Sequence, residues 1–73
     1  MNTSNLVSMA NRIGQFFASM PDRDEALFGI AQHIQRFWER RMRTELLAHF
    51  DRNHGEGLDA MILDALRAHR DLL

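Results

Sequence analysis

The sequence contains no cysteine, no tyrosine and no lysine, and it has one proline and four glycines in 73 residues. Without cysteine, the chain has no disulfide framework and no thiolate metal site. Its longest apolar stretch covers residues 26–31, whereas a membrane-spanning helix needs about 20 apolar residues. No basic residue precedes Arg12 and no apolar core follows the first methionine, so we expect no secretory signal. These absences lead us to expect a soluble, cytoplasmic protein.

The residues that are present favour helices. β-branched residues are scarce, whereas alanine, leucine, methionine, arginine, glutamate and glutamine, which are strong helix formers, are abundant. A chain of 73 residues fits one small domain around a single core. The net charge of −1 argues against both an acidic disordered tail and a strongly basic nucleic-acid binder. The sequence therefore predicts an all-α protein, a small compact bundle of three to four short helices, with residues 1–73 as one helical domain.

Apolar spacing and capping residues set the expected bounds of the helices. The predicted helices cover about residues 4–19, 22–38, 40–52 and 59–72. In the first helix, apolar residues recur at steps of three and four, which places them on one face. Thr3 or Ser4 can cap its start and Pro21 ends it. Gly14 lies inside this helix, and we interpret it as a point where a neighbouring helix approaches closely.

The boundary between the second and third helices rests on the drift of an apolar row. The row consists of residues exactly four apart in sequence: Ile34, Trp38, Met42, Leu46 and Phe50. Each step of four drifts by about 40° on a helix, so the whole row drifts by about 160°, too far for one straight helix to bury. A break near residues 38–41 restores a common buried face, although Glu39 and Arg40 are themselves good helix formers.

Capping signals mark the starts of the second and fourth helices. Asp22 with Glu25 forms a capping box pattern. Residues 53–57 form a turn, after which Asp59 can cap the last helix, with Leu58 and Leu63 as its hydrophobic staple.

Catalytic and metal-binding patterns are missing. The four histidines are His33, His49, His54 and His69. No two of them are three or four residues apart, so none form the usual zinc pair on one helix face. All serines lie within the first predicted helix, and none lies in a strand-to-helix elbow. We therefore expect no catalytic, cofactor-binding or metal-binding residue, and no enzyme activity from this chain alone.

The segment 36–43 is the one local concentration of charge, with four arginines and one glutamate and a formal charge of +3. Phe37 and Trp38 within it cannot both point to the centre of one helical stripe, so one is expected in the core and the other at its edge. Tryptophan and arginine are enriched at interface hot spots, but a solvated basic face explains the charges equally well. The predicted partner-binding residues are Phe37, Trp38, Arg41, Met42, Arg43, Gly57 and Leu58. Three ion pairs at i,i+4 spacing are also expected: Glu39 with Arg43, Arg41 with Glu45, and Arg67 with Asp71.

Four segments of the chain together resemble a known family. In order, they are Met9 to Phe17, Ile30 to Ile34, Phe37 to Arg43 and Gly55 to Asp59. This succession resembles the delta subunit of the soluble, NAD-dependent, molybdenum-containing formate dehydrogenases of bacteria, from about Leu6 to Leu66. The family usually has Asp-Pro where this chain has Glu39-Arg40, and such a proline would supply the expected bend.

The resemblance implies a small, non-catalytic accessory subunit. In such enzymes the alpha subunit carries the molybdenum–pterin site and iron–sulfur clusters, while the beta and gamma subunits carry FMN and further clusters. NAD is the remaining cofactor implied for the complex. The delta chain is linked to assembly, to maturation of the molybdenum-bearing subunit and to stability of the complex. The implied partner is therefore the alpha subunit, with no cofactor held by the delta chain itself.

Two other functions fit the sequence. A domain of this size rarely gains more than about 3–5 kcal/mol from its core, so contact with another chain is expected. The alternative to the delta subunit is a small helical homo-oligomer with a regulatory or interaction role unrelated to formate oxidation. A nucleic-acid binder ranks third, because one short basic patch on a slightly acidic chain releases few counterions. We expect neither nucleic acid nor a membrane as partner.

Overall fold

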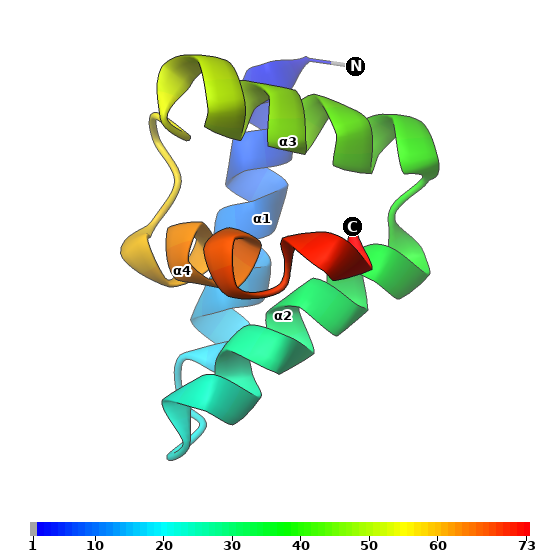
Figure 1. The fold of residues 1–73 in the computed structure, drawn as a ribbon. Helices are drawn as coiled ribbons and strands as arrows, with labels where there is room; N and C mark the ends of the chain where they lie inside the picture. The colour runs from blue at the N-terminus through cyan, green and yellow to red at the C-terminus, as the bar shows by residue number, and fades with distance from the viewer. Residues whose placement is uncertain (1) are drawn as a thin grey trace.

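The computed structural model describes residues 2–73, which fold into four α-helices and a final short 3₁₀ turn (Figure 1). The elements are α1 (Thr3–Phe17), α2 (Arg23–Phe37), α3 (Arg40–Asn53), α4 (Ala60–Ala68) and η1 (Arg70–Leu72). In Figure 1, α3 crosses the top of the molecule, α2 runs diagonally below it, and α1 passes behind. The prediction of a small all-α bundle is confirmed. No helix within residues 2–73 has the length and apolar content that crossing a bilayer requires.

All four helices contribute to one core. Its large, fully buried side chains are Leu6, Ile30, Ile34, Leu46, Ile62 and Leu66. Gly14 of α1 is buried against α4, where a Cβ atom would lie 3.0 Å from Cδ1 of Ile62. The close approach inferred for Gly14 is therefore confirmed, with α4 as the neighbouring helix.

The break between α2 and α3 lies at Trp38 and Glu39. Both residues have extended backbones, with φ −92° and ψ 137° at Trp38 and φ −62° and ψ 153° at Glu39. The amide of Trp38 makes the last bond of α2, to the carbonyl oxygen of Ile34 at 2.9 Å. This change of direction buries both Trp38 and Leu46 in the same core. The break expected from the apolar drift is confirmed, and it forms without a proline.

Two of the predicted helix caps differ from those in the structure. Asn2, rather than Thr3 or Ser4, caps α1: its Oδ1 accepts from the amide of Ser4 at 2.8 Å. Its longer side chain reaches the free amide from outside the helix, whereas Thr3 and Ser4 are already helical. Asp59 takes the N-cap position of α4 but makes no side-chain cap bond. Asp22 caps α2 as predicted, accepting from the amide of Glu25 at 3.2 Å.

The last helix is shorter than predicted, because α4 ends at Ala68 and not near residue 72. His69 leaves the helical region, with φ −130° and ψ 32°. The tighter 3₁₀ turn that follows carries Arg70 to Asp51 of α3, with an N–O distance of 2.7 Å. It also lets Leu73 pack against the core. Tertiary contacts thus outweigh the helix propensity of this segment.

Ion pairs in the structure connect different residues from those predicted. Within residues 2–73 they are Arg23–Asp64, Arg67–Asp64 and Arg70–Asp51, at 2.7, 3.1 and 2.7 Å. None of the three predicted i,i+4 pairs forms in this part of the chain. Asp71 lies beyond the end of α4, and Glu39 is the N-cap of α3 with an extended backbone, so neither residue has the helical conformation that the prediction assumed. Glu45 lines a hollow beside Thr3 of α1 instead of pairing with Arg41.

Candidate functional site

An apolar hollow with a volume of about 300 Å³ lies between α1 and α2. It is lined by Arg12, Ile13, Phe16, Phe17 and His33, and we name these five residues the aromatic groove. Three of its walls are apolar side chains, and the other two are the arginine and the histidine. The groove is therefore suited to holding apolar side chains of another molecule.

Helical spacing brings the α1 residues of the groove onto one face. Arg12 and Phe16 are four residues apart, as are Ile13 and Phe17, so the two pairs stack along the helix. Phe17 leans over Gly29 of α2, where a Cβ atom would lie 2.5 Å from Cε1 of the ring. The absence of a side chain at Gly29 thus allows the Phe17 ring to pack directly against α2.

Four rings form a continuous row from α1 to the end of α2. The centroids of Phe16 and Phe17 are 5.3 Å apart, those of Phe17 and His33 6.4 Å, and those of His33 and Phe37 4.8 Å. The first two pairs have the edge-to-face geometry that aromatic rings favour. Phe16 and Phe37, at the two ends of the row, are 77% and 72% exposed. Contiguous exposed aromatic surface is characteristic of an interaction site.

The charge around the groove is positive. Arg12 lines it, and Arg36 is exposed on α2 one turn beyond His33. No carboxylate is among the lining residues, and Arg12 has no acidic partner within 4 Å in the part of the chain described, residues 2–73. The guanidinium group of Arg12 is therefore available to an acidic group of a partner.

The predicted partner-binding segment around Phe37 is divided between core and surface. Phe37 is exposed and ends the aromatic row, whereas Trp38 is only 6% exposed and belongs to the core. The prediction that one aromatic is buried and the other lies at the edge is confirmed. Arg41 is exposed, while Met42 is half-buried against the core. Arg43 is half-buried too, and its Nε is fully buried with no hydrogen-bond partner.

The other two predicted partner-binding residues, Gly57 and Leu58, lie elsewhere. They follow the end of α3, whereas the segment around Phe37 precedes its start, so α3 separates the two sets (Figure 1). Leu58 is buried in the core, and Gly57 takes a left-handed backbone with φ 88°. Their immediate contacts are within the chain, and their role in partner binding stays a prediction.

Sequence reasoning missed all five residues of the aromatic groove, and of the four rings in the row it predicted only Phe37 as a partner-binding residue. Phe16 and Phe17 are adjacent, so they cannot both point into the core, which is the argument that separates Phe37 from Trp38. Applied to this pair, it indicates one exposed phenylalanine on α1. His33 gave no comparable signal, because its place between Phe17 and Phe37 depends on how α1 packs on α2.

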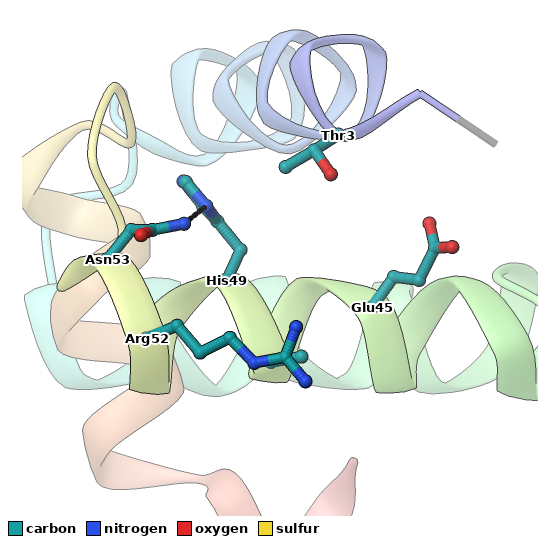
Figure 2. A pocket seen from close by; sticks show the side chains of 6 residues that line it. Thr3, Glu45, His49, Arg52 and Asn53 are labelled. Carbon is teal, nitrogen blue, oxygen red and sulfur yellow. Dashed lines mark hydrogen bonds between the residues drawn. The ribbon is translucent and has the colours of Figure 1, made fainter.

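A second, polar hollow of about 190 Å³ lies between the start of α1 and α3 (Figure 2). It is lined by Thr3, Glu45, Ala48, His49, Arg52 and Asn53. Nε2 of His49 donates to the carbonyl oxygen of Glu56 at 2.7 Å, and Nδ1 accepts from the side-chain amide of Asn53 at 3.2 Å. Both ring nitrogens are thus engaged, which leaves neither to act as a base or a ligand. Among residues 2–73, no three histidine, aspartate or glutamate side chains gather as a metal-binding group.

Comparison with protein families gives a match over most of the chain. The model of the family described as NADH-dependent formate dehydrogenase delta subunit, FdsD, matches residues 5–66. The matched range contains every residue of the aromatic groove and the loop before α4. Comparison with curated proteins and with solved structures found no match.

Proposed function

Because the chain belongs to the FdsD family of NADH-dependent formate dehydrogenase delta subunits, we propose that it is a non-catalytic accessory subunit that binds the molybdenum-bearing alpha subunit. In this role it supports assembly of the cytoplasmic enzyme, maturation of its molybdenum cofactor or stability of the complex. The observation that carries this proposal is the aromatic groove together with the exposed rings of Phe16 and Phe37, on a chain of only 73 residues.

The exposed rings favour a permanent partner. A small domain gains little stability from its core, and each exposed phenylalanine leaves apolar area in contact with water. Covering Phe16 and Phe37 in an interface recovers that hydrophobic free energy. This benefit is available to a subunit that stays bound to a larger protein.

The cofactors of the complex fit the other subunits better than this one. Iron–sulfur clusters are held mainly by cysteine thiolates, and this sequence has no cysteine. We therefore place the molybdenum–pterin, the clusters, FMN and NAD outside the delta chain. Elemental analysis and absorption spectra of the purified chain test this proposal: stoichiometric, tightly bound iron, zinc or molybdenum would contradict it.

Capture from the native host tests the partner. The tagged chain, expressed with the other formate dehydrogenase subunits, is expected to recover the alpha subunit in mass spectrometry. Phe16→Ser with Phe37→Ser is expected to lose this capture while keeping the helical circular dichroism signal. Arg52→Ser, at a residue that lines the polar hollow and not the aromatic groove, is the control and should keep the capture. The proposal is contradicted if only the tagged chain itself is recovered. It is also contradicted if the double variant recovers as much alpha subunit as the wild type does.

The basic segment after Phe37 needs its own test. Arg41 is exposed, so Arg41→Glu changes the surface charge without disturbing packing, whereas the half-buried Arg43 is a less suitable position. Weaker capture of the alpha subunit by Arg41→Glu places this segment in the interface. Unchanged capture and unchanged formate dehydrogenase activity in a deletion strain identify it as a solvated basic face.

The second candidate function is a homo-oligomer, which the same exposed rings favour because a second copy could also cover them. Light scattering of the isolated chain, at concentrations from micromolar to millimolar, distinguishes the two candidates. A stable dimer or tetramer that excludes the alpha subunit supports the homo-oligomer.

A further inference from the structure

The groove also indicates what kind of surface covers it. We infer that the aromatic groove binds an amphipathic helix of the formate dehydrogenase alpha subunit, an inference that rests on the proposed function. This helix presents apolar side chains to the ring row and a carboxylate to Arg12.

The separations of neighbouring rings are close to the rise of one helical turn. Successive centroids from Phe16 to Phe37 are 5.3, 6.4 and 4.8 Å apart, and one turn of an α-helix rises about 5.4 Å. A helix lying on the exposed rings can therefore bring side chains from successive turns to this surface. Apolar residues at positions i, i+3 or i+4, and i+7 are the usual anchors of a helix bound in a groove.

The positive charge of Arg12 favours a helix that carries an acidic side chain beside its apolar residues. Arg12 borders the apolar hollow, and among residues 2–73 no carboxylate lies within 4 Å of its guanidinium group. Arginine binds carboxylates through two parallel hydrogen bonds, and such a pair is strengthened when a partner excludes water around it. An aspartate or glutamate beside the apolar anchors would complete this pair.

The same charge disfavours a second copy of this chain as the occupant. In a two-fold symmetric dimer, both copies use the same patch. A dimer through the groove would enclose two copies of Arg12 in one interface, with no carboxylate among the groove-lining residues to pair with them. Like charges facing across an interface weaken association, so an acidic partner fits better.

Binding of Arg12 variants to the enzyme tests this inference. The full-length chain, wild type or Arg12→Glu, is titrated onto formate dehydrogenase purified from a strain lacking the delta subunit. We expect Arg12→Glu to weaken binding about tenfold or more, and Arg12→Gln by less, because only the first adds repulsion. Raising the salt concentration should weaken the wild type more than Arg12→Gln. Circular dichroism checks that each variant is folded.

Arg52→Glu, the same charge reversal at an exposed position away from the groove, is the control and should bind within about twofold of wild type. If the wild type and Arg12→Glu bind the enzyme equally well, the acidic helix is wrong as the occupant of the groove. The proposed role as a delta subunit is not affected by that result. Failure of the wild type to bind the enzyme overturns the proposed function and this inference together. A wild-type dimer that Phe16→Ser dissociates, in place of binding to the enzyme, identifies a second copy as the occupant and also overturns it.

Discussion

The side-chain amide of Asn11 in α1 donates a hydrogen bond to the carbonyl oxygen of Gly57, 2.9 Å away. Its Oδ1 accepts a second bond from the amide of Asp59, also at 2.9 Å. One side chain thus holds two backbone groups of the loop that leads into α4, where Asp59 makes no cap bond of its own. Between them, Leu58 is held in the core. The start of α4 is therefore fixed by a residue 46 positions away from Gly57.

We expect Asn11→Ala to lower the free energy of unfolding by about 1–2 kcal/mol, because it removes two hydrogen bonds that each contribute about 0.5–1.5 kcal/mol. Urea denaturation followed by circular dichroism measures the change. Asn5→Ala, the same substitution at an exposed position of the same helix, is the matched control. Equal stabilities of the two variants would show that the bonds of Asn11 contribute nothing.

Gly29 and Phe17 are expected to be coupled. A Cβ atom at Gly29 would lie 2.5 Å from Cε1 of Phe17, so Gly29→Ala must displace the ring. Alanine normally favours a helix interior over glycine by about 1 kcal/mol. We nevertheless expect Gly29→Ala to destabilise the fold by about 1 kcal/mol, because overpacking costs about 1–3 kcal/mol.

A double-mutant cycle checks this origin. In the Phe17→Leu background the smaller side chain leaves room, so Gly29→Ala should there be neutral or stabilising. A coupling of about 0.5–3 kcal/mol is expected for residues in contact. Identical effects of Gly29→Ala in both backgrounds would mean that the ring does not need the space.

Arg40→Pro is expected to be tolerated and to raise the free energy of unfolding by about 0.4–1 kcal/mol. Arg40 is the first residue of α3, a position where the amide has no intrahelical partner and proline is common. The preceding Glu39 has φ −62° and ψ 153°, which is the conformation that a residue before proline prefers. Thermal and urea unfolding measure the gain.

Arg41→Pro is the comparison that tests the position of the break. It forces Arg40, which is helical here, out of the α region. We expect it to destabilise the fold, in contrast to the variant one residue earlier. Equal tolerance of proline at both positions would contradict a helix start fixed at Arg40.

Two aspartates make the stability of the fold depend on pH in the acidic range. The hydrogen bond from Arg23 lowers the pKa of Asp64, and that from Arg70 lowers the pKa of Asp51, from an ordinary value of 3.8. Because both carboxyls bind protons less readily in the folded state, their stabilisation is complete above their ordinary pKa. It is lost as the pH falls through the lowered pKa of each. Both groups are exposed, so the effect is small.

Urea unfolding between pH 6 and pH 2 measures this dependence. As the pH falls below the ordinary pKa of the two aspartates, the free energy of unfolding of the wild type should decrease. In the double variant Asp64→Asn and Asp51→Asn this decrease should be smaller. Asp24→Asn, at an exposed position without an ion pair among residues 2–73, is the control. The same pH profile for wild type and double variant would rule out a contribution from these pairs.

Local patterns in the sequence predicted the helices and the break. The drift of apolar residues from Ile34 to Phe50 indicated a break near residues 38–41, and the structure has it at Trp38 and Glu39. It forms without a helix-breaking residue, because burial on one face outweighs the helix propensity of Glu39. Gly14 likewise indicated a close helix contact. These features depend on the spacing of residues within one segment, which the sequence records directly.

Features set by packing between helices could not be predicted in the same way. Asp64 pairs with Arg23, 41 residues away, whereas the predicted ion pairs were local to one helix. The α1 half of the groove depends on Gly29 admitting Phe17 beside His33. Such contacts depend on how α1, α2 and α4 are placed relative to one another. The spacing of residues within each helix does not determine that placement.

Photo-cross-linking from Phe16, at one end of the row of rings, is the most direct test of partner binding through the aromatic groove. Phe16 is replaced by the photoreactive p-benzoylphenylalanine in the full chain, co-expressed with the other formate dehydrogenase subunits, and the cross-linked product is identified by mass spectrometry. Phe28, which is 45% exposed and packs against His69, provides the control position. We predict that position 16 cross-links to a helix of the alpha subunit and that position 28 gives no such product. A cross-link from position 16 to a second copy of this chain, or no cross-link at all, would contradict partner binding through the aromatic groove.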